Sequence, residues 1–223
     1  LGSSKVLGVA LPSLVTSSES IRLAEQQCKK LGIELRMISI TEPHASLEKA
    51  IRNQTGTPLA PRTHENLQSR IRGQILMALT TEPAVHKLLG TEKIAVINTA
   101  NKSEAAVGYC TLYGDTVGIL SPLGDCLKSR VFDLAQAMPD EVLAEIIARP
   151  PSAELSLNQT DEEALMPYRE LDLILSMHLE SNIPFHLIEE NLNGSQLGFP
   201  QMSEKIKRTQ MLLRHSEFKR KQM

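Results

Sequence analysis

Few residues of the reactive kinds occur in this 223-residue chain, which has three cysteines, no tryptophan and only 3% aromatic residues. The cysteines are Cys28, Cys110 and Cys126, and no two of them form a Cys-x-x-Cys pair. An odd, scattered set argues against a disulfide framework and against a zinc site built on cysteine. We therefore expect a protein of the reducing cytoplasm.

Long apolar runs and a strong net charge are also absent. No stretch approaches the roughly 20 apolar residues of a membrane helix. The first residues lack the charged-then-apolar pattern of a signal peptide. Because the net charge is −2, nothing favours bulk binding to nucleic acid or to an anionic membrane, and we expect neither as a partner.

Familiar catalytic motifs are missing as well. The chain has no Gly-x-Ser-x-Gly elbow and no dinucleotide-binding glycine fingerprint. Its histidines lack the i,i+4 spacing of a zinc-binding helix. We interpret all six as surface or incidental residues: His44, His64, His86, His178, His186 and His215.

A strand, a helix and a second strand are predicted near the start of the chain. Residues 6–11 form an apolar run stopped by Pro12, which is typical of a buried strand. Ser17 can cap a helix that carries apolar residues at helical spacing up to a stop at Gly32. Residues 33–40 read as the next strand. This βαβ order predicts an α/β fold with a Rossmann-like parallel sheet and helices on both faces.

Further elements follow along the chain. We predict a loop over Asn53–His64, a helix over Glu65–Thr80 and a buried strand over Ile94–Ile97. Three more helical stretches are predicted over Lys128–Met138, Leu165–Glu180 and Pro200–Lys221.

The polar cluster after the predicted Ile94–Ile97 strand is the sharpest candidate for a site. It contains Thr99, Asn101, Lys102, Ser103 and Glu104. Ligands of open parallel sheets bind at the carboxyl ends of strands. A helix start there offers N–H groups to an anion, and Glu104 could hold Mg²⁺. The alternative is a plain helix cap of the Ser-x-x-Glu kind with a solvated Lys102.

Other polar segments allow two interpretations each. Arg70 and Arg72 could clamp phosphates or simply face solvent. The loop Gly108–Asp115 could wrap a flat ligand or form an ordinary turn. Lys128 could reach a phosphate as a point charge or form a surface ion pair with Asp125.

Taken together, these segments resemble the NAD synthetase family, in particular the synthetase domain of its glutamine-dependent branch. The matching stretches occur in the family's order over nearly the whole chain: Leu7–Ser13, Glu65–Gly73, Thr99–Glu104, Gly108–Asp115, Pro122–Asp125 with Lys128, Pro150–Leu155 with Gln159 and Asp161, and Lys219–Gln222. Each stretch is weak alone, and the ordered set is specific.

The resemblance implies an ATP-pyrophosphatase fold of the adenine nucleotide alpha-hydrolase type, in a homodimer to which the Glu65–Thr80 helix contributes. It implies ATP-dependent amidation of deamido-NAD to NAD through an acyl-adenylate, with ammonia, ATP and Mg²⁺. The residues implied to bind ATP are Thr99, Lys128 and Ser152. Those implied to bind deamido-NAD are Asn66, Arg70, Glu104, Asp115 and Lys219, with Glu104 at the metal. No catalytic nucleophile is implied.

Three departures from the family stand out. Its Ser-Gly-Gly-x-Asp-Ser loop, which cradles pyrophosphate, has no match and would lie upstream of Val6. Its glutaminase domain is not in these residues, and Ala100 stands where the family usually has Gly. We expect residues 1–223 to form one synthetase domain, truncated at both ends and inactive alone. Two alternatives are a non-catalytic dimeric nucleotide-binding module and a related ATP pyrophosphatase such as a GMP synthetase.

Overall fold

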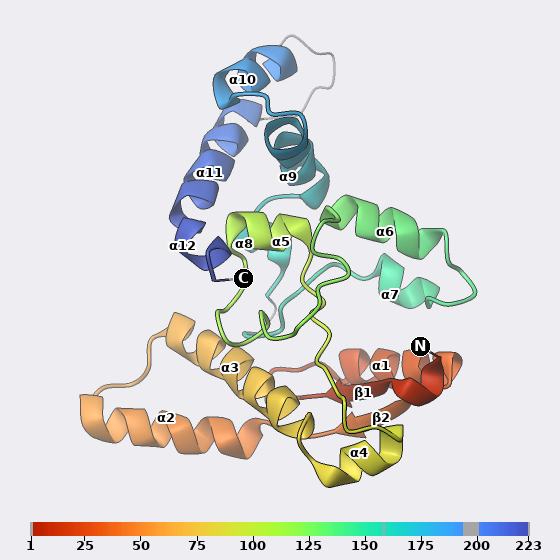
Figure 1. The fold of residues 1–223 in the computed structure, drawn as a ribbon. Coiled ribbons are helices and arrows are strands. Elements are labelled where there is room, and N and C mark those ends of the chain that lie inside the picture. Colours follow the sequence, from red (N-terminus) through yellow and green to blue (C-terminus); the bar gives the residue numbers. More distant parts are fainter. Residues whose placement is uncertain (1, 158, 194–200, 223) are drawn as a thin grey trace.

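A computed structural model describes residues 2–157, 159–193 and 201–222 (Figure 1). Two strands and a larger number of helices make up the fold, as the α/β prediction requires. In chain order after the short helix Ser3–Lys5 they are β1 (Leu7–Ala10), α1 (Ser18–Leu31), β2 (Glu34–Met37), α2 (Thr41–Thr55), α3 (Pro61–Leu79), α4 (Pro83–Leu89), α5 (Lys102–Val107), α6 (Lys128–Gln136), α7 (Ala144–Ala148), α8 (Asp161–Ala164), α9 (Tyr168–Leu175), η2 (Ser176–Glu180), α10 (Phe185–Asn193), α11 (Met202–His215) and α12 (Glu217–Arg220).

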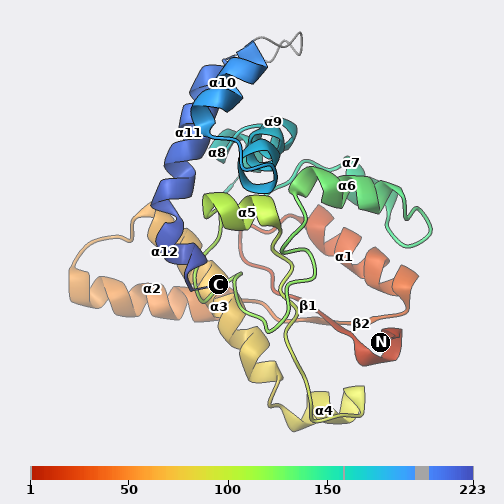
Figure 2. The same ribbon diagram turned by 45° about the horizontal axis from the view of Figure 1, so that its top comes forward.

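The predicted βαβ unit is confirmed. β1 and β2 pair in parallel with Leu7 opposite Glu34, and α1 connects them. The side chain of Ser17 accepts a hydrogen bond from the N–H of Ser20, and Gly32 ends α1 in the left-handed conformation at φ 65°. Residues of β1 are half-buried rather than fully buried. Figures 1 and 2 show α1 on one side of the two strands and α4 on the other.

The strand predicted over Ile94–Ile97 is wrong. Residues 93–96 have no regular structure, and Ile97 makes a single parallel bridge to Leu120 with 47% of its surface exposed. An apolar run becomes a strand only where a neighbouring chain satisfies its backbone N–H and C=O groups over several residues. Here two bonds, from Ile119 N–H to Val96 O and from Asn98 N–H to Leu120 O, are the backbone pairing between these segments.

The helix boundaries also differ from the sequence pattern. α2 extends to Thr55, so residues 53–55 of the predicted loop are helical, and α3 begins at Pro61, four residues before the predicted start. Proline suits the first turn of a helix because its missing N–H has no partner there in any case. The loop between the two helices is therefore only residues 56–60.

The C-terminal helices form the main core. α5, α9 and α11 contribute Ala106, Leu171, Leu175 and Leu213 to one buried cluster. A second cluster around Ile174 joins α9, α10 and α11. The predicted final helix divides into α11 and α12, and its predicted first residue, Pro200, lies outside the described residues. Among the described residues, no helix combines the length and hydropathy of a membrane span.

Candidate functional site

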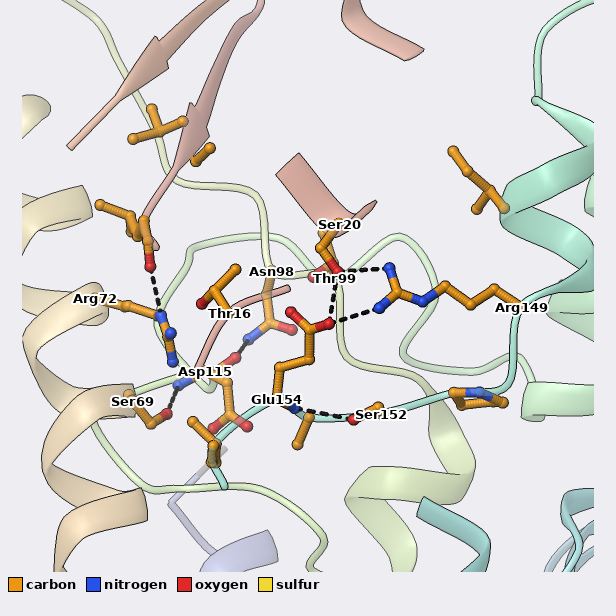
Figure 3. Close-up of a pocket in the computed structure, with 18 of the residues that line it drawn as sticks. Thr16, Ser20, Ser69, Arg72, Asn98, Thr99, Asp115, Arg149, Ser152 and Glu154 are labelled. Atoms are coloured by element: carbon orange, nitrogen blue, oxygen red, sulfur yellow. Dashed lines mark hydrogen bonds and ion pairs between the residues drawn. The ribbon is translucent and has the colours of Figure 1, made fainter. Parts of the chain in front are cut away.

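Two cavities adjoin one another, and the first lies at the carboxyl end of β1. The first cavity, of about 770 Å³, is bounded by residues 9–12, the start of α1, α3, residues 96–99 and residues 149–155 (Figure 3). The second cavity, of about 710 Å³, lies between α3, the start of α5, residues 108–112 and α12. Both are large enough for a nucleotide-sized ligand.

All eight residues singled out for ATP and deamido-NAD line the second cavity. They are Asn66, Arg70, Thr99, Glu104, Asp115, Lys128, Ser152 and Lys219. The three assigned to ATP, and Asp115, also line the first cavity. The three ATP residues, Thr99, Lys128 and Ser152, therefore belong to the wall that the two cavities share. The convergence is a fact of the fold, whereas the ligand of each residue stays a prediction.

Glu104 closes the helix cap that the sequence offered as one alternative, and it also binds the side chain of Lys128. Its Oε2 accepts the N–H of Asn101, while the Asn101 side chain accepts the N–H of Glu104 at 3.0 Å, so the two close a capping box at the start of α5. Its Oε1 accepts a hydrogen bond from Lys128 Nζ at 2.9 Å. The capping box thus fixes the position of the Glu104 carboxylate, and this carboxylate fixes the position of the Lys128 ammonium group.

Lys128 is held at the first residue of α6. Its N–H donates to Ser103 Oγ at 2.9 Å, and Ser103 in turn donates to the buried carboxylate of Asp172. The ammonium group lies 5.4 Å from the ring centre of Tyr168. Because the side chain is only 20% exposed, its charge acts in a partly desolvated wall, where it is screened less than at the surface.

Lys102 and Asp125 do not belong to the lining. Lys102 Nζ lies 2.9 Å from Asp125 and 3.2 Å from Glu180, so the prediction of a solvated Lys102 is wrong. The pKa of Lys102 is raised, mainly by its hydrogen bond to Asp125. The partial burial of Lys102 acts in the opposite direction but is outweighed by Asp125 and Glu180. Asp125 is thus paired with Lys102, while Lys128 pairs with Glu104.

The loop Gly108–Asp115 contains a turn at residues 112–116, and hydrogen bonds to α3 hold this turn in place. Asp115 Oδ1 accepts the N–H of Thr111 at 2.6 Å, and Thr111 Oγ1 donates to Asn66 Oδ1 at 3.0 Å. Although Asp115 is exposed to the cavities, desolvation by surrounding protein raises the pKa of its carboxyl group, against the lowering effect of the Thr111 N–H. The loop therefore presents an acidic group in a fixed position.

Two cations brace the outer part of the same loop. Lys219 Nζ donates to the carbonyl oxygens of Gly108 at 2.8 Å and Cys110 at 2.6 Å. Arg70 Nε donates to Leu112 O at 3.2 Å. Burial raises the pKa of the Cys110 thiol to about 11, which Lys219 only partly offsets. A raised pKa disfavours the thiolate, which is the nucleophilic form of cysteine.

A second polar cluster in the first cavity was missed from the sequence. Arg149 donates to Glu154 Oε1 at 2.6 Å, and the Ser20 hydroxyl donates to the same oxygen at 2.7 Å (Figure 3). Arg149 also donates to Ser17 Oγ at 2.9 Å. Burial works against the charge of Glu154, but the bonds from Ser20 and Ser17 and the charge of Arg149 hold its pKa below the usual value. No local pattern marks this cluster, because it joins residues 17 and 20 to residues 149 and 154, more than 100 positions away.

We expect Glu154→Gln to lower the free energy of unfolding by about 1 kcal/mol at neutral pH, since charge-assisted bonds become neutral ones. A lowered folded-state pKa stabilises the protein above the ordinary glutamate value, and that stability is lost as the pH falls through the lowered one. Urea unfolding across that acidic range should therefore show a steeper loss for the unmodified chain. Equal slopes for both proteins would contradict the assignment.

Arg72 was offered as a phosphate clamp or a solvent-facing residue, and the structure places it in the first cavity. Its Nε donates to Leu11 O at 3.0 Å, just beyond β1. Burial lowers the pKa of its guanidinium group, only partly opposed by the charge of Glu154. The solvent-facing alternative is therefore wrong for Arg72, whereas Arg70 is exposed at the rim of the second cavity.

Comparison with known proteins finds one family over the whole chain. The NAD synthase family profile matches residues 1–223. The glutamine-dependent NAD(+) synthetase of Rhodobacter capsulatus is 38% identical over 235 residues, covering 99% of this chain and 39% of the relative. That of Xylella fastidiosa (strain Temecula1) is 44% identical over 185 residues, covering 81% and 32%. The chain thus spans about two fifths or less of the length of these curated relatives.

Solved structures agree on the fold. An NMN synthetase from Francisella tularensis has a TM-score of 0.70 at 26% identity, covering 96% of this chain and 75% of that one. A glutamine-dependent NAD+ synthetase from Acinetobacter baumannii, solved in complex with ADP, has a TM-score of 0.60 at 30% identity, covering 100% and 38%. This chain shares its α/β fold with parallel strands with these two structures.

Proposed function

This chain belongs to the NAD synthase family, and we propose that it converts deamido-NAD to NAD by ATP-dependent amidation. The observation that carries the proposal is the shared wall, where the three residues assigned to ATP separate the two cavities. ATP occupies the first cavity and deamido-NAD the second, so that the nicotinate carboxylate meets the α-phosphate between Thr99, Lys128 and Ser152.

The reaction proceeds in two steps. An oxygen of the nicotinate carboxylate attacks the α-phosphorus of ATP, and the bond to pyrophosphate breaks. Ammonia then attacks the acyl carbon of the adenylate, AMP leaves with the former carboxylate oxygen, and a proton is released. The chain acts by positioning two bound substrates and by stabilising charge, so no nucleophilic side chain is needed.

Each residue of the shared wall has a role in this scheme. The Lys128 ammonium stabilises the negative charge that develops around the α-phosphate. The hydroxyl groups of Thr99 and Ser152 supply neutral donors to phosphate oxygens. All four residues implied by the resemblance on the dinucleotide side orient deamido-NAD. Of these, Asp115 lines both cavities, and the other three line only the second: Asn66, Arg70 and Lys219. Glu104 positions Lys128 through the hydrogen bond between Oε1 and Nζ.

Mg²⁺ belongs to the proposal through Glu104. Magnesium sites in ATP-using enzymes need only one or two carboxylates, because water and substrate phosphates complete the coordination. Glu104 fits as that carboxylate, since it lines the second cavity beside the shared wall. When bound there with ATP, the ion would neutralise phosphate charge.

Assembly and ammonia supply are further parts of the proposal. The relatives are named glutamine-dependent and are more than twice as long as the matched region, which supports ammonia delivery from glutamine by a separate glutaminase domain. We place the enzyme in the cytoplasm as a homodimer, with α3 at the interface. Met77 on α3 is 47% exposed, which suits an apolar contact there.

Isotope transfer tests the reaction directly. The full-length gene product is supplied with ATP, Mg²⁺, ammonia and deamido-NAD labelled with ¹⁸O in the carboxylate. We expect NAD, pyrophosphate and AMP that carries one ¹⁸O atom, measured by mass spectrometry. Formation of ADP and phosphate, or unlabelled AMP, would overturn the acyl-adenylate.

Two further arms of that experiment separate the alternatives. Nicotinate mononucleotide is offered as a competing acceptor, because one structural relative is named an NMN synthetase. We expect the dinucleotide to be preferred, since the second cavity extends from α3 to α12. Binding of ATP without turnover of either acceptor would instead favour a non-catalytic nucleotide-binding module.

A further inference from the structure

Three potential metal ligands meet where α2 packs on α3, apart from both cavities. His44 and Glu48 are one turn apart on α2, so their side chains share a face, and His64 lies in the first turns of α3. One ligand atom of each residue lies within 4.8 Å of the others, and His64 Nε2 is 3.7 Å from Glu48 Oε1. The imidazole centres of His44 and His64 are 5.5 Å apart.

The polar atoms of this cluster are incompletely satisfied. His44 Nε2 is buried and has no hydrogen-bond partner. A buried nitrogen without a partner loses its hydration and gains nothing in return, so such atoms are rare in folded proteins. Glu48 and His64 keep only 27% and 33% of their side chains exposed. The cluster thus presents two imidazoles and a carboxylate to one partly enclosed point.

We propose that His44, Glu48 and His64 bind a zinc ion. Zinc takes imidazole nitrogen and carboxylate oxygen at about 2.0–2.2 Å, which places tetrahedral ligand atoms about 3.3 Å apart. Closing the present separations to that value needs side-chain shifts of about 1.5 Å or less. Two imidazoles favour zinc over the hard cations Mg²⁺ and Ca²⁺, which prefer sites built of oxygen. Three protein ligands leave the fourth position to water.

The ion would hold α2 against α3. This helix has no fully buried residue and packs chiefly against α3. α3 in turn carries Asn66 and Arg70, which line the second cavity. A bound ion that joins residues 44 and 48 to residue 64 would hold the outer helix to the one that bears the site.

The proposal departs from the interpretation of all six histidines as surface or incidental residues. The usual zinc-binding helix carries two histidines at i,i+4, whereas here the i,i+4 partner of His44 is Glu48 and the second histidine comes from the next helix. The inference does not depend on the proposed reaction, because none of its residues lines either cavity.

Metal binding is measured on the chain after chelation and dialysis, with Zn²⁺ by calorimetry and with Co²⁺ as a spectroscopic substitute. We expect a single zinc ion per chain, the strong visible absorption of four-coordinate Co²⁺, and no displacement by excess Mg²⁺. His64→Ala and Glu48→Gln should each weaken zinc binding by about 100-fold. His215→Ala is the matched control, because His215 is an exposed histidine on α11, and it should bind zinc unchanged.

Zinc should also raise the thermal unfolding midpoint of the unmodified chain and of His215→Ala, but not that of His64→Ala or Glu48→Gln, because only a ligand bound to the folded state stabilises it. Undiminished binding in both cluster variants would overturn the proposal. So would the absence of zinc binding in the unmodified chain, or a Co²⁺–thiolate charge-transfer band, which would place the ion on a cysteine.

Discussion

Replacing Lys128 with Met is expected to lower kcat for NAD formation by about 10²–10³-fold in the full-length gene product, the usual effect of losing a pre-oriented group that stabilises transition-state charge. The methionine keeps most of the aliphatic stem and removes the ammonium group from the wall that both cavities share. If charge develops on the α-phosphate in the transition state, kcat falls and KM for ATP changes little. Steady-state kinetics with ammonia as the nitrogen source measure both.

The same variant should lose stability for a separate reason. The Glu104 side chain is 17% exposed, and the variant would remove its ion-pair partner at 2.9 Å. Adding Glu104→Gln removes the carboxylate charge, and the amide oxygen can still accept the Asn101 N–H that closes the α5 cap. We expect the double variant to recover most of the thermal stability and none of the activity.

Lys102→Met is the matched control for this prediction. Lys102 is also a partly buried lysine at a helix start with carboxylate partners, but it lines neither cavity. Its replacement should therefore leave kcat within about twofold of the unmodified value, as for most changes away from a site. A Lys128→Met protein with raised KM and unchanged kcat would show that Lys128 only binds ATP.

Which residues gather around the second cavity was more predictable from the sequence than how their side chains contact one another. The order of short polar segments picked out residues from α3 to α12, and the structure brings them around one cavity. Local pattern could not reveal that Glu104 caps α5 with one oxygen and holds Lys128 with the other. The contact between Glu104 and Lys128 depends on the position of the first residue of α6 relative to α5. The spacing of residues along the chain does not determine that position.

The elements and contacts that depend on residues far away in the chain could not be predicted from the sequence. Residues 94–97 are as apolar as a central strand, but an extended segment needs pairing along its length, and here it has one bridge. The bond from Arg149 to Ser17 joins residues 132 positions apart, so no periodicity announces it. In contrast, the βαβ unit was predictable because Ser17 and Gly32 act locally as cap and stop.

Gly73→Ala is expected to destabilise the protein by about 1–3 kcal/mol, the usual cost of overpacking. In an unencumbered helix the same change stabilises by about 1 kcal/mol, so the sign itself is diagnostic. A Cβ at Gly73 would lie 2.8 Å from the carbonyl oxygen of Gly114 and 2.9 Å from that of Tyr113. Both are backbone atoms, and Tyr113 already has a positive φ of 63°.

The loop cannot retreat from α3 without losing the site. Asp115 N–H donates to Ser69 Oγ at 3.1 Å on α3, and Asn98 Nδ2 donates to Asp115 O at 3.0 Å, so the turn is fastened on both sides (Figure 3). Displacing it moves the Asp115 carboxylate, and we expect deamido-NAD affinity to fall about tenfold, the equivalent of about 1.4 kcal/mol. Urea unfolding and calorimetric titration measure the two effects. Gln74→Ala, at the exposed neighbouring position, should change neither; a Gly73→Ala chain as stable as Gln74→Ala would mean that the loop does not pack against α3 at Gly73.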